Sequence, residues 1–168
     1  MPWRSRLAGS RRAWPPTFPA LPSRPMSPSL SPDRIQQARE FAAALTPGLR
    51  ICITTHVNPD GDGLGSEAGL AHLLKAQGIH AVVTNPSPTP ERYHFLFGGL
   101  PGVDRSHEAV KELRKADLIL VLDISDVGRL GMLSQTVQDR GVPVACVDHH
   151  ASAGHLPDGP RYVDPDAS

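Results

Sequence analysis

The sequence lacks three features that would point to particular classes of protein. No stretch approaches the roughly 18 to 20 uninterrupted apolar residues that span a bilayer, so we expect neither a transmembrane protein nor a membrane partner. Two cysteines, Cys52 and Cys146, are too few for a disulfide framework, and their apolar surroundings indicate buried thiols. Neither charge is in excess, because 17 Lys and Arg balance 17 Asp and Glu. A length of 168 residues then indicates one globular domain of ordinary size, with a tail. We expect the protein to be cytoplasmic.

The balanced charge conceals two unlike parts. Residues 1–32 contain five Arg, no acidic residue and 8 of the 18 Pro. The other 136 residues contain 12 basic and 17 acidic groups, so the main body is acidic. If such a body acts on a polyanion such as nucleic acid, its carboxylates must serve something other than direct attraction. Bound metal ions are the first candidate.

Residues 1–30 are predicted to be a disordered tail rich in Pro and Arg, because prolines recur every few residues and no apolar period is present. An Arg-rich start without acids also resembles a transit peptide, although the prolines oppose the amphipathic helix that such peptides form. An over-long gene start, with translation beginning near Met26, stays open as well.

Removal of residues 1–30 is expected to leave the melting temperature unchanged, because that stretch has no periodic apolar face to bury. Thermal denaturation of the shortened and the full chain tests this. A fall of several degrees on removal would show instead that the tail packs on the core.

From Ser31 onward, short apolar strands alternate with helical patterns. Ser31 followed by Pro32 is typical of a helix start, and Gly78 of a helix end. We expect helices over residues 32–45, 64–77, 108–115 and 130–139, and strands over residues 50–55, 80–84, 118–123 and 142–147. This alternation predicts an α/β fold, with a mainly parallel sheet covered by helices on both faces, in a domain over residues 31–168.

Acidic and imidazole side chains follow three of the predicted strands. They are His56, Asp60 and Asp62 after the first, Asp123 after the third, and Asp148, His149 and His150 after the fourth. An Asp just after a strand often caps a helix or makes a turn. In an open parallel sheet, however, the ligand crevice lies beyond the carboxyl ends of the strands, so we expect these groups to converge there.

Such a cluster needs cations, because two carboxylates about 4 Å apart repel by ~4 kcal/mol at an effective dielectric of 20. Mixed carboxylate and imidazole ligands favour a first-row transition ion, and four Asp are enough for two divalent ions. Mn²⁺ is the first choice and Mg²⁺ the second, since imidazole suits Mg²⁺ poorly. Zn²⁺ is disfavoured by the absence of a C-x-x-C pair.

The glycine-rich turn GDGLGS at residues 61–66 superficially imitates a dinucleotide-binding turn. Its spacing is G-x-G-x-x-S, and two carboxylates, Asp60 and Asp62, lie at the start of the helix. They would repel a pyrophosphate unless metal intervenes, which disfavours nicotinamide binding.

Three motifs closely resemble the first three motifs of the DHH phosphoesterase family. They are His56-x-x-x-Asp60-x-Asp62 followed by Gly65-Ser66, the isolated Asp123, and Asp148-His149-His150. The resemblance covers roughly residues 48–168. It is strongest with the bifunctional oligoribonuclease and 3′-phosphoadenosine-5′-phosphate (pAp) phosphatase group, through HVNPDGDGLGS and the run from Tyr162 to Ser168.

The resemblance implies a phosphohydrolase that cleaves short oligonucleotides or pAp with water activated by two Mn²⁺ ions. It implies these metal ligands: His56, Asp60, Asp62, Asp123 and His149. Asp123 would bridge the ions and form the catalytic set with His149 and His150. Asp148 would not bind a metal ion itself but would orient a neighbouring imidazole. His150 would meet the substrate phosphate, with Arg129 as a further phosphate contact.

The resemblance also implies a fourth metal-binding Asp and a C-terminal domain that grips the substrate, and neither occurs before Ser168. We read Asp164 as a turn residue and not as the missing ligand. We therefore expect the domain to be incomplete at its C-terminus, with little activity in the chain as given; an oligomer is compatible with the sequence. Two alternatives stay open: a family II-like inorganic pyrophosphatase and a catalytically inert metal-binding fragment.

Overall fold

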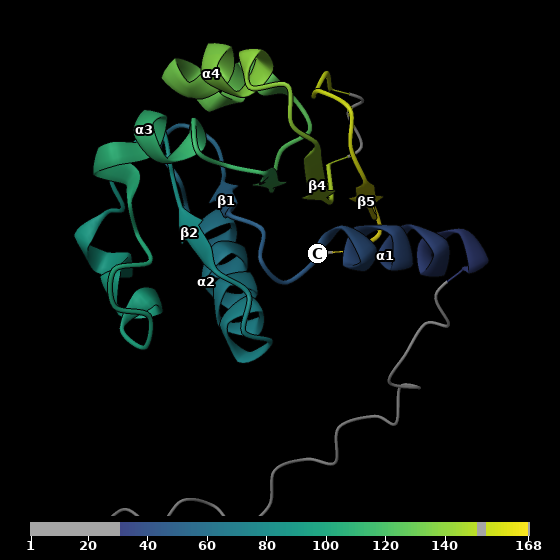
Figure 1. Ribbon diagram of the computed structural model, residues 1–168, viewed down its shortest axis with the longest axis horizontal. Coiled ribbons are helices and arrows are strands. Elements are labelled where there is room, and N and C mark those ends of the chain that lie inside the picture. Colours follow the sequence, from purple (N-terminus) through teal and green to yellow (C-terminus); the bar gives the residue numbers. More distant parts are fainter. Residues whose placement is uncertain (1–30, 151–153, 168) are drawn as a thin grey trace, which may run out of the picture. The chain divides into compact units, whose positions relative to one another are not determined.

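The computed structural model describes residues 31–150 and 154–167 and contains a five-stranded parallel sheet between two layers of helices (Figure 1). The predicted tail lies outside the described residues, so the structure does not test the prediction about its removal. The strands are β1 (Ile51–Thr54), β2 (Ala81–Val83), β3 (Leu118–Leu122), β4 (Val144–Asp148) and β5 (Arg161–Val163). The α-helices are α1 (Pro32–Ala44), α2 (Gly61–Ala76), α3 (Ala109–Leu113) and α4 (Ser134–Asp139). The 3₁₀ helices are η1 (Glu91–Phe97), η2 (Ser106–Glu108) and η3 (Val127–Leu133).

The sheet has the strand order β2-β1-β3-β4-β5, and every neighbouring pair is parallel. The α/β prediction with a parallel sheet is therefore confirmed. The chain passes from β1 to β2 on one side and then returns to place β3 on the other side of β1. The order of strands thus reverses between β1 and β3, which is where ligands bind in open parallel sheets, beyond the carboxyl ends of the strands.

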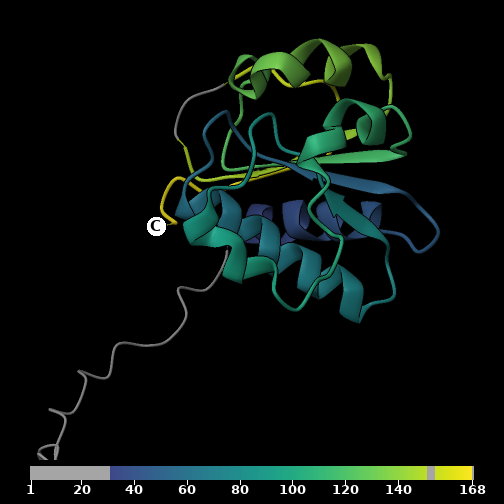
Figure 2. The same cartoon turned by 90° about the vertical axis from the view of Figure 1, so that its left-hand side faces the viewer.

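Helices cover both faces of the sheet, as the sequence predicts. Figure 2 shows α1 and α2 against one face and α3 and α4 against the other. Side chains alternate along the buried strands, so Ile51 and Ile53 join the core beneath α2. Cys52, between them, joins the core beneath α3 and α4.

Both cysteines are buried and free, in agreement with the structural role expected of them. Burial raises the pKa of Cys52 to about 12 and that of Cys146 to about 11, so both thiols stay protonated at neutral pH. Among the described residues, no helix has both the length and the apolar character needed to cross a membrane.

Four local features differ from the sequence-based prediction. Helix α2 begins at Gly61 and not at residue 64, because the carboxylate of Asp60 accepts hydrogen bonds from the backbone N–H groups of Asp62 and Gly63. The single helix expected over residues 130–139 is η3 followed by α4, because Gly131 has a non-helical φ of 53°. Helix η1 and strand β5 were not expected at all.

Candidate metal centre

The first part of the candidate centre is the loop between β1 and α2, which carries His56 and Asp60. His56 is only 8% exposed, and its Nδ1 lies 2.9 Å from the carbonyl oxygen of Val57. A proton on Nδ1 donates to that carbonyl, which leaves the lone pair of Nε2 facing two carboxylates. Nε2 lies 3.8 Å from Oδ2 of Asp60 and 3.5 Å from Oδ2 of Asp123.

Asp60 serves two purposes at the start of α2. Its Oδ1 accepts hydrogen bonds of 3.1 Å from the N–H of Gly63 and 3.0 Å from that of Asp62. These bonds lower the pKa of Asp60, with the bond from Gly63 as the largest cause. The carboxylate is therefore ionised at neutral pH, and its other oxygen faces His56.

Asp123 lies at the centre of the cluster, directly after β3. Its backbone has a φ of 63°, in the left-handed region, which Asp tolerates better than most residues. The side chain is 8% exposed. Burial raises the pKa of Asp123, and the nearby carboxylates of Asp62 and Asp60 raise it further. The fold thus holds a carboxylate where its negative charge is disfavoured until a cation arrives.

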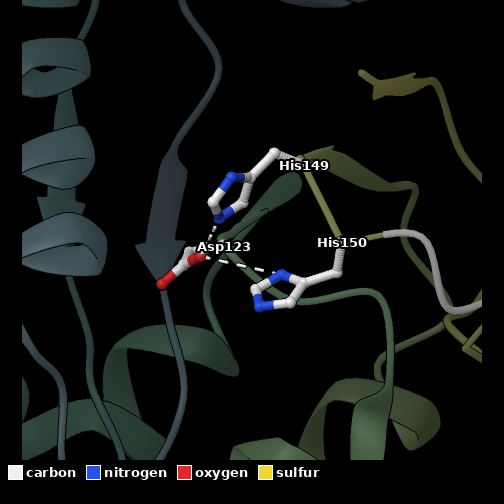
Figure 3. A group of neighbouring side chains, drawn as sticks. All are labelled: Asp123, His149 and His150. Atoms are coloured by element: carbon white, nitrogen blue, oxygen red, sulfur yellow. Dashed lines mark ion pairs between the residues drawn. The ribbon is translucent and has the colours of Figure 1, made fainter. Parts of the chain in front are cut away.

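The third part follows β4, where His149 and His150 both point toward Asp123 (Figure 3). Nε2 of His149 lies 3.3 Å from Oδ1 of Asp123 and 3.5 Å from Oδ2 of Asp62. The carbonyl oxygen of Ala167 lies 3.2 Å from Nδ1 of His149 and is the main cause that raises the pKa of this imidazole.

Asp148 fixes the position of His150 through hydrogen bonds. Its Oδ1 lies 2.6 Å from Nδ1 of His150 and accepts the backbone N–H groups of His149 and His150. Burial alone would raise the pKa of Asp148, but hydrogen bonds from Ser125 and His150 outweigh it and keep the pKa below its usual value. An ionised Asp148 fixes the orientation of His150.

The structure therefore brings together the seven strand-end residues singled out from the sequence. Asp123 belongs to two groups of three side chains, one with His56 and Asp60 and one with His149 and His150. Within each group, one ligand atom from every residue lies within 4.8 Å of the others. Nε2 of His56 is buried and has no hydrogen-bond partner among the described residues. A divalent ion would give this nitrogen a partner, and the imidazole and carboxylate donors suit such an ion.

Two further residues lie at the edge of this cluster. Arg129 is exposed on η3. Its carbonyl oxygen accepts the N–H of Val57 at 2.9 Å; Val57 lies in the loop between β1 and α2, which we call the ligand loop.

A cavity of about 200 Å³ opens beside Asp62 and Asp123 and is lined also by Asp164. The carboxylate of Asp164 pairs with Arg34 at 2.5 Å and accepts the N–H of Asp166, which matches its interpretation as a turn residue.

Sequence reasoning did not single out Ser125, whose hydroxyl donates to Oδ2 of Asp148. Ser125 thereby supports the carboxylate that orients His150. The only signal in the sequence is its position two residues after Asp123, and a serine beyond a strand is too common to indicate such a role.

Known proteins resemble this chain in both sequence and structure. The model of the DHH family, N-terminal domain, matches residues 50–168. The chain is 33% identical over 122 residues to the bifunctional oligoribonuclease and PAP phosphatase NrnA of Thermus thermophilus, which covers 68% of this chain and 32% of that protein. The crystal structure of an exopolyphosphatase-related protein from Bacteroides fragilis matches with a TM-score of 0.67 and 25% identity, over 80% of this chain and 40% of that one. The chain thus spans about a third of the length of the curated relative.

Proposed function

We propose that this chain, which belongs to the DHH family, is a metal-dependent phosphohydrolase that acts on short oligonucleotides or on pAp. The observation that carries the proposal is the buried carboxylate of Asp123, shared by two groups of potential ligands. The substrate class is supported by the 33% identity to a relative whose name gives both activities.

Two divalent ions, Mn²⁺ in preference to Mg²⁺, fit this donor set. In the proposal His56, Asp60 and Asp123 hold one ion, and Asp62, Asp123 and His149 hold the other. Bound ions of this kind supply positive charge next to a phosphate and lower the pKa of a coordinated water.

The remaining side chains act on the substrate. His150, held through Nδ1 by Asp148, keeps its Nε2 for the phosphate that is cleaved. Arg129, exposed on η3 next to the ligand loop, adds a guanidinium that can bind a phosphate oxygen. Both groups would stabilise the negative charge that grows on the phosphate during cleavage.

The test is hydrolysis by the purified chain of three substrates: a labelled dinucleotide, pAp and inorganic pyrophosphate. Enzyme is in excess over substrate, so that slow turnover is still seen, and reactions with Mn²⁺ are compared with reactions in a chelator. We expect Mn²⁺-dependent release of mononucleotide from the dinucleotide or of phosphate from pAp. Cleavage of pyrophosphate alone would indicate a pyrophosphatase, and Mn²⁺ binding without cleavage of any substrate would indicate an inert metal-binding module.

A further inference from the structure

Helix η1 lies beside the candidate metal centre, although none of its residues belongs to it. The ring of Tyr93 lies against Gly61, where its Cε1 and hydroxyl oxygen are 3.4 Å from the position that a Cβ atom would take. Gly61 is the residue between Asp60 and Asp62. The start of α2 therefore carries two potential ligands of the centre and also supports η1.

Further contacts hold η1 in place. Phe97 is buried in the core beneath α2, and Tyr93 and Leu96 pack against the same core. The loop that precedes η1 is bound to the ligand loop, because Ser87 accepts the backbone N–H of Asn58 at 3.2 Å. The outer side of η1 thus has a fixed position relative to the centre.

Two exposed side chains on η1, Arg92 and Phe95, are three residues apart. Side chains three apart in a 3₁₀ helix lie on the same side. The guanidinium of Arg92 stacks over the ring of Tyr93, with 4.7 Å between Cζ and the ring centroid. It forms no ion pair or hydrogen bond with the residues that the structure describes. Phe95 is 74% exposed, more than any other large apolar side chain among the described residues.

A guanidinium beside an exposed aromatic ring has the chemistry to bind one nucleotide. Arginine binds phosphate through two parallel hydrogen bonds, and its stacking on Tyr93 reduces the freedom lost on binding. Aromatic rings such as that of Phe95 stack on nucleobases of any sequence. The centre itself is rich in carboxylates, so a cation at its rim would help a second phosphate to approach.

We propose that Arg92 and Phe95 form a subsite for the nucleotide next to the cleaved phosphate, in which Arg92 binds its phosphate and Phe95 stacks on its base. This proposal rests on the proposed function, because the proposed site of cleavage determines where the second nucleotide of the substrate lies. It favours oligonucleotides over small phosphate esters, because only a substrate with a second nucleotide reaches the subsite.

The first test is equilibrium binding, in the presence of Mn²⁺, of a labelled dinucleotide that carries a terminal phosphate and whose cleavable internucleotide ester is replaced by a methylenephosphonate. We expect Arg92→Ala and Arg92→Gln to weaken binding about tenfold or more, and Phe95→Ala roughly fivefold or more. Arg114→Ala is the matched control, because Arg114 is an exposed arginine at the end of α3, on the other face of the sheet. It should bind as the unchanged chain does.

Two further measurements separate this proposal from the proposed function. Calorimetric Mn²⁺ titration and hydrolysis of bis(p-nitrophenyl) phosphate should be unchanged in the Arg92 and Phe95 variants. Unchanged dinucleotide binding in all variants would overturn the subsite and leave the proposed function standing. Weakened binding in a chain that cleaves no substrate would support the subsite and refute the proposed function. If the unchanged chain does not bind the dinucleotide, the subsite is refuted.

Discussion

Replacement of Asp123 by alanine is expected to abolish the binding of divalent ions. Its carboxylate lies 3.5 Å from Nε2 of His56 and 3.3 Å from Nε2 of His149, so both potential sites lose the same ligand. Loss of an outer partner of a metal site already costs about 10-fold to 100-fold in affinity, and loss of a shared ligand should cost more than about 100-fold. Calorimetric titration with Mn²⁺ measures the effect.

Asp164→Ala is the matched control for this experiment. Asp164 is equally buried and lines the same cavity, but its carboxylate is occupied by Arg34 and by the N–H of Asp166. We expect this variant to lose part of the attachment of α1 to the end of β5 and to keep its affinity for Mn²⁺. Equal losses of affinity in the two variants would refute the assignment of Asp123.

Asp123→Asn distinguishes a lost ligand from a damaged fold. Burial and the charges of Asp62 and Asp60 raise the pKa of Asp123, so the ionised carboxylate is disfavoured in the folded chain without metal. The neutral amide removes that cost. In a chelator, Asp123→Asn is therefore expected to melt at the same temperature as the unchanged chain or higher, while it still fails to bind Mn²⁺.

The position of the candidate centre could be predicted from the sequence because it depends on a simple geometric rule. Apolar strands such as residues 118–122 are easily recognised, and a parallel sheet brings the residues after each strand to one edge. His56, Asp123 and His149, far apart in the sequence, could be expected to meet for this reason alone.

The parts that were missed depend on contacts that leave little trace in the sequence. Strand β5 has only three residues, too few to form a recognisable strand pattern in the sequence, and it is stabilised by its pairing with β4. Helix η1 follows a proline-rich loop and is held by the packing of Tyr93 and Phe97 and not by a helical repeat. The role of Ser125 depends on the distance between the loop after β3 and the last residue of β4.

Glu67 is a further residue whose environment the sequence conceals. It lies in the second turn of α2, where a glutamate would ordinarily face water, yet it is completely buried. Its Oε2 accepts a hydrogen bond of 2.8 Å from the side chain of Asn85, and the side-chain oxygen of Asn85 accepts the N–H of Thr55 at 3.0 Å. Glu67 is thus connected through Asn85 to the residue immediately before His56.

Burial raises the pKa of Glu67 from 4.5 to about 8, the hydrogen bond from Asn85 opposes this, and the charge of Asp104 adds to it. The folded chain therefore keeps a proton on Glu67 at pH values at which the unfolded chain has lost it. This contribution to stability is fully present below about pH 4.5 and is lost as the pH rises through about 8. The slope from this one group is at most about 1.4 kcal/mol per pH unit, which amounts to several kcal/mol over the interval.

Glu67→Gln is expected to remove most of this pH dependence, because the amide is neutral at every pH and its oxygen can still accept the hydrogen bond from Asn85. Urea unfolding between pH 5 and pH 9, in a chelator, measures the free energy of unfolding of both proteins. The variant should match the unchanged chain or fall slightly below it at pH 5, and exceed it by several kcal/mol at pH 9. Glu40→Gln, at an exposed position on α1, is the control and should keep the original pH profile. Parallel profiles for Glu67→Gln and the unchanged chain would mean that Glu67 is ionised in the folded state, and that a positive partner or water within α2 and its neighbours stabilises the charge.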